Sequence, residues 1–197
     1  MKLRLPLALA GAAALSGCGL NSVPTAEENV KARWADVQAD YQRRADLIPN
    51  LVATVKGSVQ GEDKVLTDVM NARAKATQVT VNAGDLTDAA KVQQFAQAQG
   101  QLNGSLSRLL AVSERYPDVK SQENFKTLMS QLEGTENRVT IAIRDYNTAV
   151  QEYNTRIRTF PDAIGAKIFY GAKPYTPYAA TTPGAENAPT VSFGNSF

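Results

Sequence analysis

The sequence contains no histidine, and this absence limits the chemistry available to the chain. Histidine is the commonest general base and the commonest neutral metal ligand in proteins. Mechanisms that depend on a serine–histidine or cysteine–histidine pair are therefore excluded. A glycine-rich phosphate loop of the P-loop or dinucleotide type is missing as well. We expect no metal, no cofactor and no enzymatic activity.

Carboxylates in pairs are the remaining route to acid–base chemistry. Glu133 and Glu136 stand one helical turn apart, as do Asp85 and Asp88, so either pair could offer two carboxylates on one face. On helices, solvated or ion-paired carboxylates are far commoner than acid and base pairs. We therefore assign no catalytic residue.

Cysteine occurs once, at Cys18. It follows a basic start at Lys2 and Arg4, an apolar run over residues 5–15 and two small residues, which is the layout of a secretory signal. The apolar run is much shorter than the about 20 residues that a membrane-spanning helix needs. The sequence therefore predicts export without a spanning helix.

The segment Leu15-Ser16-Gly17-Cys18 resembles the bacterial lipoprotein box, in which a leucine and two small residues precede a cysteine. The resemblance implies cleavage between Gly17 and Cys18, a diacylglyceryl group on the Cys18 thiol and acylation of the new amino group. Two such chains anchor a protein stably, at about 0.8 kcal/mol per buried methylene. The alternative is an ordinary signal peptide followed by a free thiol. Gly19 is not the aspartate that commonly retains lipoproteins in the inner membrane, so we expect the outer membrane in a two-membrane host.

Charge is balanced in the mature chain. Cleavage removes two of the 21 basic residues and leaves 19 against 19 acidic residues, so the formal net charge falls from +2 to zero. No basic excess remains to bind nucleic acid or an anionic membrane surface. The expected partners are the membrane, through the lipid anchor, and other envelope or membrane proteins, with the mature protein facing the periplasm.

Apolar residues recur at steps of three and four along most of the mature chain, which predicts helices. The stripes run from Val30 to Val59, from Val65 to Ala76, from Val92 to Leu109 and from Phe125 to Phe160. Four helices with short connections favour an all-α fold, an antiparallel up-and-down four-helix bundle with long first and last helices. Asp85 or Thr87 could cap the third helix, and close packing against a neighbouring helix could explain Gly100 and Gly104 within it.

Composition shifts after the last stripe, because five of the nine prolines lie from Pro161 onward. We expect an extended Pro- and aromatic-rich tail that first packs back on the bundle and is loose from Thr181. The residues expected to pack are Ile164, Ile168, Phe169, Tyr170, Tyr175 and Tyr178. The predicted organisation is a signal peptide at 1–17, a lipidated tether at 18–25, the bundle at 26–160 and the tail at 161–197.

Two local features carry further predictions. Pro49 removes one ladder hydrogen bond and crowds the carbonyl of Ala45, so either the first helix kinks or Asp46 caps a new helix. The stripe resumes in phase, which favours the kink.

In the last stripe, "DYNTAV" and "EYNTRI" repeat at seven residues, so Asn147 and Asn154 share a face. Polar residues repeated beside a seam usually fix register and partner orientation.

The densest polar stretch is "YQRRADLIPNL" at 41–51. One hypothesis is a site for a small acidic or peptide-like ligand near Arg43, Arg44 and Asn50. The favoured alternative is an internal network in which one of the two arginines pairs with a carboxylate across the bundle. The residues involved are Arg43, Arg44, Asp46, Asn50, Glu133 and Glu136. Arg73 and Arg108 are interpreted as structural too, with aliphatic stems covering the core.

Long ungapped blocks cover the mature chain: "WADVQADYQRRADLIPNLVATVKG" (34–57), "ARAKAT" (72–77), "FAQAQGQLNGSLSRLLAVSERYPDVKSQENF" (95–125), "QLEGTENRVTIAIRDYNTAVQEYNTRIRTFP" (131–161) and "PGAENAPTVSF" (183–193). In these blocks the chain resembles the LemA family of bacterial envelope proteins. It departs from the family at "IFYGAKPY" (168–175), and "VQGED" (59–63) lacks a histidine that many relatives have.

The resemblance implies a helical bundle on the outer side of the cytoplasmic membrane or in the periplasm. Family members commonly begin with an uncleaved membrane helix, whereas this chain looks lipidated. No enzymatic activity and no catalytic residues come with the resemblance. We therefore expect a membrane-anchored, non-enzymatic scaffold or adaptor of the cell envelope, with a periplasmic ligand-binding protein as the alternative.

Overall fold

The computed structural model describes residues 21–57, 59 and 61–179. Every regular element in these ranges is helical, which confirms the all-α class. The predicted signal peptide, Gly17 included, lies outside the described residues, as do the predicted lipidation site Cys18 and the tail from residue 180.

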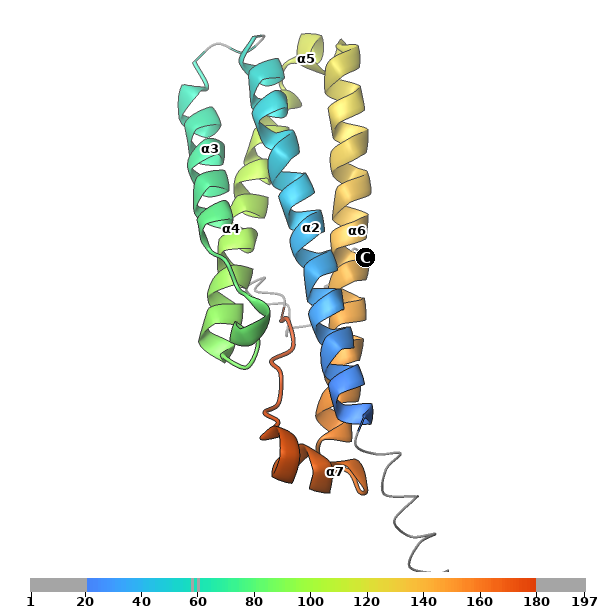
Figure 1. The fold of residues 1–197 in the computed structure, drawn as a ribbon. Coiled ribbons are helices and arrows are strands. Elements are labelled where there is room, and N and C mark those ends of the chain that lie inside the picture. The colour runs from blue at the N-terminus through green and yellow to red at the C-terminus, as the bar shows by residue number, and fades with distance from the viewer. Residues whose placement is uncertain (1–20, 58, 60, 180–197) are drawn as a thin grey trace, which may run out of the picture.

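The four long helices of the described residues run side by side and alternate in direction along the chain (Figure 1). They are α2 (Ser22–Lys56), α3 (Asp63–Gln78), α4 (Ala89–Ser113) and α6 (Glu123–Arg156). The shorter elements are the 3-10 helix η1 (Ala83–Asp85), α5 (Pro117–Ser121), α7 (Asp162–Gly165) and the π-helix η2 (Ala166–Tyr170).

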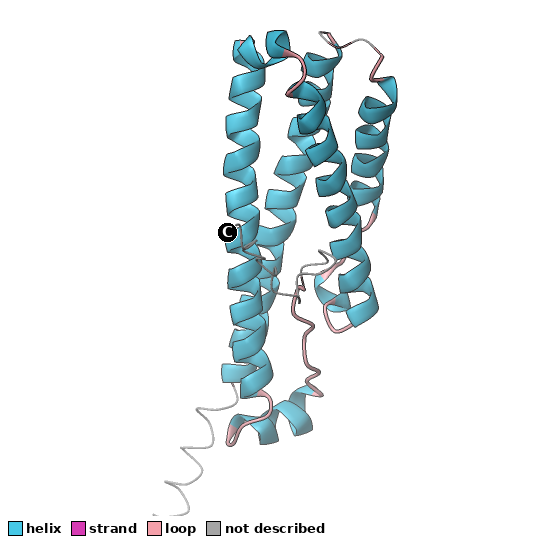
Figure 2. Cartoon of the chain, turned by 180° about the vertical axis from the view of Figure 1, so that it is seen from behind, coloured by secondary structure: helices cyan, strands magenta, loops and turns pink. Residues whose placement is uncertain are grey.

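The helices do not all pack against their neighbours to the same extent. α2 packs along α6, α3 packs along α4, and α2 also meets α3. α4 and α6 lie farther apart, and this opens a groove on one side of the molecule. α7 packs near α2 at the end where α2 begins and α6 finishes (Figures 1 and 2).

The apolar stripes are the buried faces of these helices. One cluster lies around Trp34, Tyr146 and Tyr153, and a second lies around Ile48 and Leu102. Burial of the stripes drives the packing, at roughly 25 cal/mol for each Å² of apolar surface removed from water. Trp34 also donates from Nε1 to the carbonyl of Val81 at 2.7 Å, which fastens the α3–α4 connection to α2.

Several boundaries differ from the predictions. α2 is one helix with Pro49 inside it, so the alternative of a new helix capped by Asp46 is wrong. α2 also begins at Ser22, so residues 22–25, which we assigned to the tether, are helical. The last helix ends at Arg156 rather than at Phe160.

The start of α4 also corrects the sequence prediction. Asp88, not Asp85 or Thr87, caps this helix by accepting hydrogen bonds from the backbone N–H groups of Ala90 and Lys91. Asp85 instead closes a capping box with Asn82 around η1. Two helices that start a few residues apart both offer free backbone N–H groups. A nearby aspartate can therefore cap either helix, and the sequence alone does not say which one.

Two further expectations fail. A Cβ added at Gly104 would meet nothing within 4 Å, so close helix packing does not explain this glycine. In the tail, Tyr175 and Tyr178 pack on the bundle as expected, but Ile164, Ile168, Phe169 and Tyr170 are exposed. Composition alone does not distinguish an aromatic segment that docks from one that faces outward.

Candidate functional site

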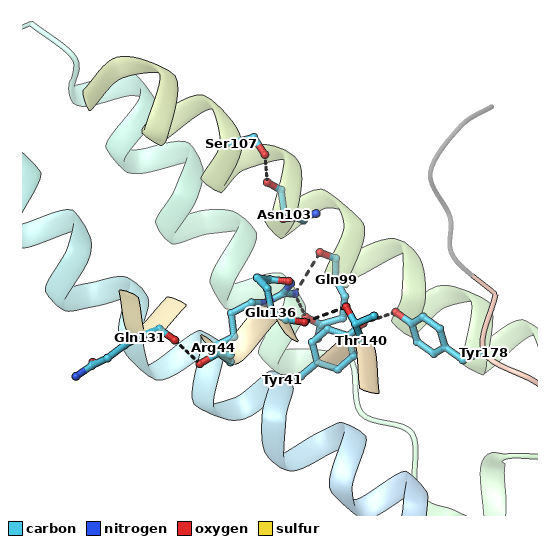
Figure 3. A network of polar contacts seen from close by, with 10 residues as sticks. Tyr41, Arg44, Gln99, Asn103, Ser107, Gln131, Glu136, Thr140 and Tyr178 are labelled. Atoms are coloured by element: carbon cyan, nitrogen blue, oxygen red, sulfur yellow. Dashed lines mark hydrogen bonds and ion pairs between the residues drawn. The ribbon is translucent and has the colours of Figure 1, made fainter. Parts of the chain in front are cut away.

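Arg44 is the one charged side chain that is fully buried among the described residues, at 2% exposure. It points inward from α2 to two partners (Figure 3). Nη1 donates to Oε1 of Glu136 in α6 at 3.0 Å, and Nη2 donates to Oε1 of Gln99 in α4 at 2.8 Å. Charge-assisted hydrogen bonds of this kind are shorter and stronger than neutral ones.

Gln99 extends this contact to α3, the remaining long helix. Its Nε2 donates to the carbonyl of Ala76 at 3.2 Å. Ala76 lies in the last turn of α3, where carbonyl groups lack partners within the helix. The chain of contacts through Arg44, Gln99 and Glu136, called the central network below, therefore joins α2, α3, α4 and α6.

The central network separates the two apolar clusters. On α2, Arg44 lies between Tyr41 of one cluster and Ile48 of the other. On α4, Gln99 lies between Ala96 and Leu102 in the same way. A buried polar layer requires the opposing layers to align, since a misplaced charge left without a partner costs several kcal/mol.

Two tyrosines extend the network to the tail. The guanidinium of Arg44 lies over the ring of Tyr41, 4.8 Å from its centroid. The hydroxyls of Tyr41 and Tyr178 are 2.6 Å apart and share a hydrogen bond. Burial raises the pKa of both hydroxyl groups above their ordinary range, so both keep their protons to a higher pH than a free tyrosine does.

Of the six predicted site residues, the structure brings together only Arg44 and Glu136. Arg43, Asp46, Asn50 and Glu133 are exposed. Asp46 accepts a hydrogen bond from Gln42 on the surface of α2. The predicted ligand residues therefore do not converge, and the arrangement has the form of the internal network that the sequence favoured.

The groove between α4 and α6 reaches the central network and has a volume of about 1160 Å³. Most of its lining residues are polar, with Asn103 and Ser107 from α4 and Thr140 from α6 among them (Figure 3). Arg44 and Glu136 lie at its lining, whereas Arg43 and Asn50 do not.

The carboxylate pairs do not form acid–base pairs. Glu136 binds Arg44, while Glu133 is exposed. Asp85 binds Lys91 and the backbone of Asn82, and these bonds lower the pKa of Asp85. Within the described ranges, no three His, Cys, Asp or Glu side chains gather as a metal site would require.

The tail docks on α6 through the asparagine pair of the seven-residue repeat. Asn154 donates to the carbonyl of Tyr175 at 2.8 Å and accepts from its N–H at 2.9 Å. Asn147 holds Tyr178 in the same two-way manner, at 2.9 and 2.8 Å. The repeat thus fixes register, as expected, but against the extended tail rather than against another helix.

The residue between these two anchors is held as well. Thr176 donates from its N–H to the carbonyl of Leu86 at 2.8 Å, and its own carbonyl accepts from the hydroxyl of Tyr146 at 2.7 Å. The ring of Tyr175 packs on Tyr153, with centroids 4.9 Å apart. Residues 175–178 form no regular secondary structure, but the backbone N–H and carbonyl groups of Tyr175, Thr176 and Tyr178 are all paired with the bundle.

Among the helices of the described ranges, none combines the length and the apolar character required to cross a bilayer.

The chain has relatives among known proteins. The chain is similar to magnetosome proteins MamQ 2 and MamQ 1 of Paramagnetospirillum magneticum (strain ATCC 700264 / AMB-1), each 26% identical over 159 residues, and to MamQ of Magnetospirillum gryphiswaldense (strain DSM 6361 / JCM 21280 / NBRC 15271 / MSR-1), 24% identical over 157 residues. These alignments cover 72% of this chain but only 58% of each relative, so the chain matches little more than half of their length. The sequence model of the LemA family matches residues 33–193. The chain therefore belongs to the LemA family.

Proposed function

We propose that this protein is a lipid-anchored envelope protein whose antiparallel four-helix bundle serves as a non-enzymatic scaffold or adaptor. The observation that carries the proposal is the central network, in which Arg44, the one fully buried charge of the described residues, joins all four long helices. Its polar groups bind one another instead of converging on an empty site. Such an arrangement favours a stiff rod that presents its outer surfaces to partners.

The lipid anchor is inferred from the residues that precede α2. The lipoprotein box ends at Cys18, and α2 begins at Ser22. The linker from Cys18 to Asn21 spans at most about 11 Å when extended. An acylated Cys18 would therefore hold the first turn of α2 close to the lipid surface and direct the rod into the periplasm, from the outer membrane where the host has two membranes.

Intact mass and membrane fractionation of the full chain, expressed in a bacterial host, test the anchor. The wild type should lose residues 1–17, gain the mass of a lipid-modified cysteine and fractionate with the membrane. Cys18→Ser should do none of these. Asn21→Ala, three residues beyond the box, is the matched control and should behave as the wild type. A wild type that is unmodified and soluble would refute the anchor.

The scaffold role needs a separate experiment. A photocrosslinking amino acid at Ile141, which is 49% exposed on the side of α6, samples the rod surface in living cells. Discrete adducts with envelope proteins would support a scaffold. Recovery of nothing beyond the background of a buried position, such as Val139, would count against it.

A second candidate, a binding protein for a small acidic or peptide-like ligand, rests on the groove between α4 and α6. Arg44 lines this groove, and its Nε has no hydrogen-bond partner among the described residues. A ligand that raises the melting temperature of the wild type should lose this effect in Asn103→Ala. Asn103 is exposed in the groove wall and its side chain takes no part in the central network, so the variant should remain as stable as the wild type.

A further inference from the structure

The segment from Phe160 to Lys173, called the tip below, contains an unusual group of exposed apolar side chains. Six large hydrophobic residues are exposed among the described residues, and five of them lie in the tip. Phe160 is 82% exposed, and Ile168 and Phe169 are 68% and 67% exposed. The other two are Ile164 and Tyr170. Soluble surfaces usually scatter such residues singly, so this cluster indicates an interaction surface.

The tip is a folded element rather than a loose end. Gly165 and Ala166 are buried at its base, and Ala172 donates from its N–H to the carbonyl of Ala166 at 3.0 Å. Gly171 has a φ of 54°, a conformation that glycine adopts without strain, and it reverses the chain after η2. Asn154 then fixes the next segment through Tyr175. The exposed side chains are therefore presented from a fixed platform.

The tip lies at the end of the molecule where α2 begins (Figure 1). α7 packs near α2, and α2 starts at Ser22, four residues after Cys18. The exposed apolar cluster and the proposed acyl anchor therefore belong to the same end of the rod. A surface at this end is held against the bilayer, whereas a surface at the other end is held away from it.

Residues 155–174, which include the tip, differ in charge from the whole chain. Residues 155–174 contain the basic residues Arg156, Arg158, Lys167 and Lys173, all exposed, and one acidic residue, Asp162. Four positive charges against one negative charge give a formal +3, in a mature chain whose total is zero. This local excess complements the negative headgroups of anionic phospholipids.

We propose that the tip is a second membrane contact, in which Phe160, Ile168 and Phe169 insert into the interfacial layer of a bilayer that contains anionic phospholipid. Aromatic and aliphatic side chains enter this layer to about 5–10 Å, while lysine and arginine bind the phosphates. The proposal rests on the proposed function for the choice of membrane, since the anchor brings the tip to it. With two contacts, the rod stands at a fixed angle instead of swinging on its short linker.

A tryptophan placed in the tip reports on this contact. The chain has one tryptophan, Trp34, which is 1% exposed in the core and should therefore add the same background emission in all variants. Phe169→Trp adds an emitter in the tip, and Ile141→Trp adds one at the side of α6 as the matched control. The full acylated chain is reconstituted in vesicles of phosphatidylethanolamine and phosphatidylglycerol whose acyl chains are brominated, since bromine quenches only fluorophores that reach it. Circular dichroism establishes that both variants are folded.

The expected result is quenching of the added emission in Phe169→Trp and none in Ile141→Trp or the wild type. Acylated protein that floats with the vesicles while Phe169→Trp stays unquenched overturns the tip proposal and leaves the anchor intact. Unmodified protein refutes the anchor instead; vesicles are then added to that chain, and quenching of Phe169→Trp supports the tip on its own, while its absence overturns it. Dimers in solution that protect Phe169→Trp from vesicle lipids would also overturn the proposal, in favour of a second copy of this chain.

The charge contribution is tested with the unacylated Cys18→Ser chain, whose binding to vesicles is weak enough to measure. Lys167→Gln should reduce binding to vesicles containing phosphatidylglycerol by about fivefold, because each basic residue near an anionic surface adds that much. Lys126→Gln, on an exposed lysine near the start of α6, is the control and should bind as the parent does. Equal binding by Lys167→Gln and its parent would contradict the charge argument.

Discussion

Arg73 of α3 donates from Nε to the carbonyl oxygen of Ala45 in α2 at 2.7 Å. This carbonyl is the acceptor that the residue four positions later would normally use, and that residue is Pro49, which has no N–H. A side chain from the neighbouring helix therefore supplies the hydrogen bond that proline removes. This hydrogen bond explains how α2 continues through Pro49, and it fixes the position of α3 along α2.

Arg73→Ala should lower the free energy of unfolding by about 1–3 kcal/mol, because it leaves a buried carbonyl without a donor. Urea unfolding followed by circular dichroism measures the change. Lys75→Ala, an exposed lysine two residues along α3, should change it by less than about 0.5 kcal/mol.

A double-mutant cycle with Pro49→Ala tests the assigned cause. In that background an alanine amide at position 49 can donate to the Ala45 carbonyl, so Arg73→Ala should cost clearly less than in the wild type. An equal cost in both backgrounds would show that Arg73 stabilises the protein by packing alone.

The central network predicts unequal effects for residues that look alike in the sequence. Arg44→Ala should destabilise the protein by about 3 kcal/mol, since it removes a buried cation and leaves Gln99 without its partner. The adjacent Arg43→Ala, on an exposed side chain, should change the free energy of unfolding by less than about 0.5 kcal/mol.

On α6, the two glutamates should also differ in their effect on stability. Glu136→Gln should cost about 2 kcal/mol because the buried Arg44 loses its counter-charge, whereas Glu133→Gln should be neutral. Thermal and urea unfolding of the four variants give these values. Similar losses for Arg43→Ala and Arg44→Ala would contradict the assignment.

Asn147 and Asn154 should control the attachment of the tail. Each amide makes two hydrogen bonds to the tail backbone, so Asn154→Ala should speed hydrogen exchange at the amide of Tyr175, and Asn147→Ala should do so at Tyr178. Each variant should lose about 1–3 kcal/mol of global stability. Asn137→Ala, an exposed asparagine on α6, is the matched control. Unchanged protection of both tyrosine amides would show that ring packing alone holds the tail.

The helices could be predicted from the sequence because their apolar periodicity is strong. Val92, Phe95, Leu102, Leu106 and Leu109 are all buried, as their spacing predicts. The sequence predicts that Arg43 or Arg44 pairs with Glu133 or Glu136, and the structure pairs Arg44 with Glu136. The choice between the two glutamates depends on the rotation of α6 about its axis, which packing against α2 decides and local sequence does not.

The sequence does not predict which residues of the tail and the tip pack on the bundle, and the reason is a different one. Tyr175 docks because Asn154 pairs with its backbone, a contact between residues 21 apart in the chain. Ile168 and Phe169 have the same apolar character but face outward. A net charge counted over the whole mature chain also averages to zero and hides the basic excess of residues 155–174.

Alkaline pH should destabilise the protein through its buried tyrosines. Burial, with Glu27 nearby, raises the pKa of Tyr175 to about 12, and burial also raises the pKa of Tyr41, Tyr146 and Tyr178. An unfolded tyrosine titrates near pH 10. The folded state therefore holds these protons more tightly than the unfolded state. The resulting stability is fully present below about pH 10 and is lost as the pH rises through the folded pKa, about 12 for Tyr175.

Urea unfolding at a series of pH values from about 8 to about 11 measures this loss as a falling free energy of unfolding. Tyr175→Phe keeps the ring that packs on Tyr153 but has no proton to lose, so its free energy should fall less steeply over the same range. The variant also loses the bond from the Tyr175 hydroxyl to Glu27 at 3.3 Å, which lowers stability by a similar amount at every pH below about 10. The slope rather than the absolute value therefore carries the test. Identical slopes for Tyr175→Phe and the wild type would mean that this hydroxyl titrates alike in both states, and that the docked tail leaves it open to water.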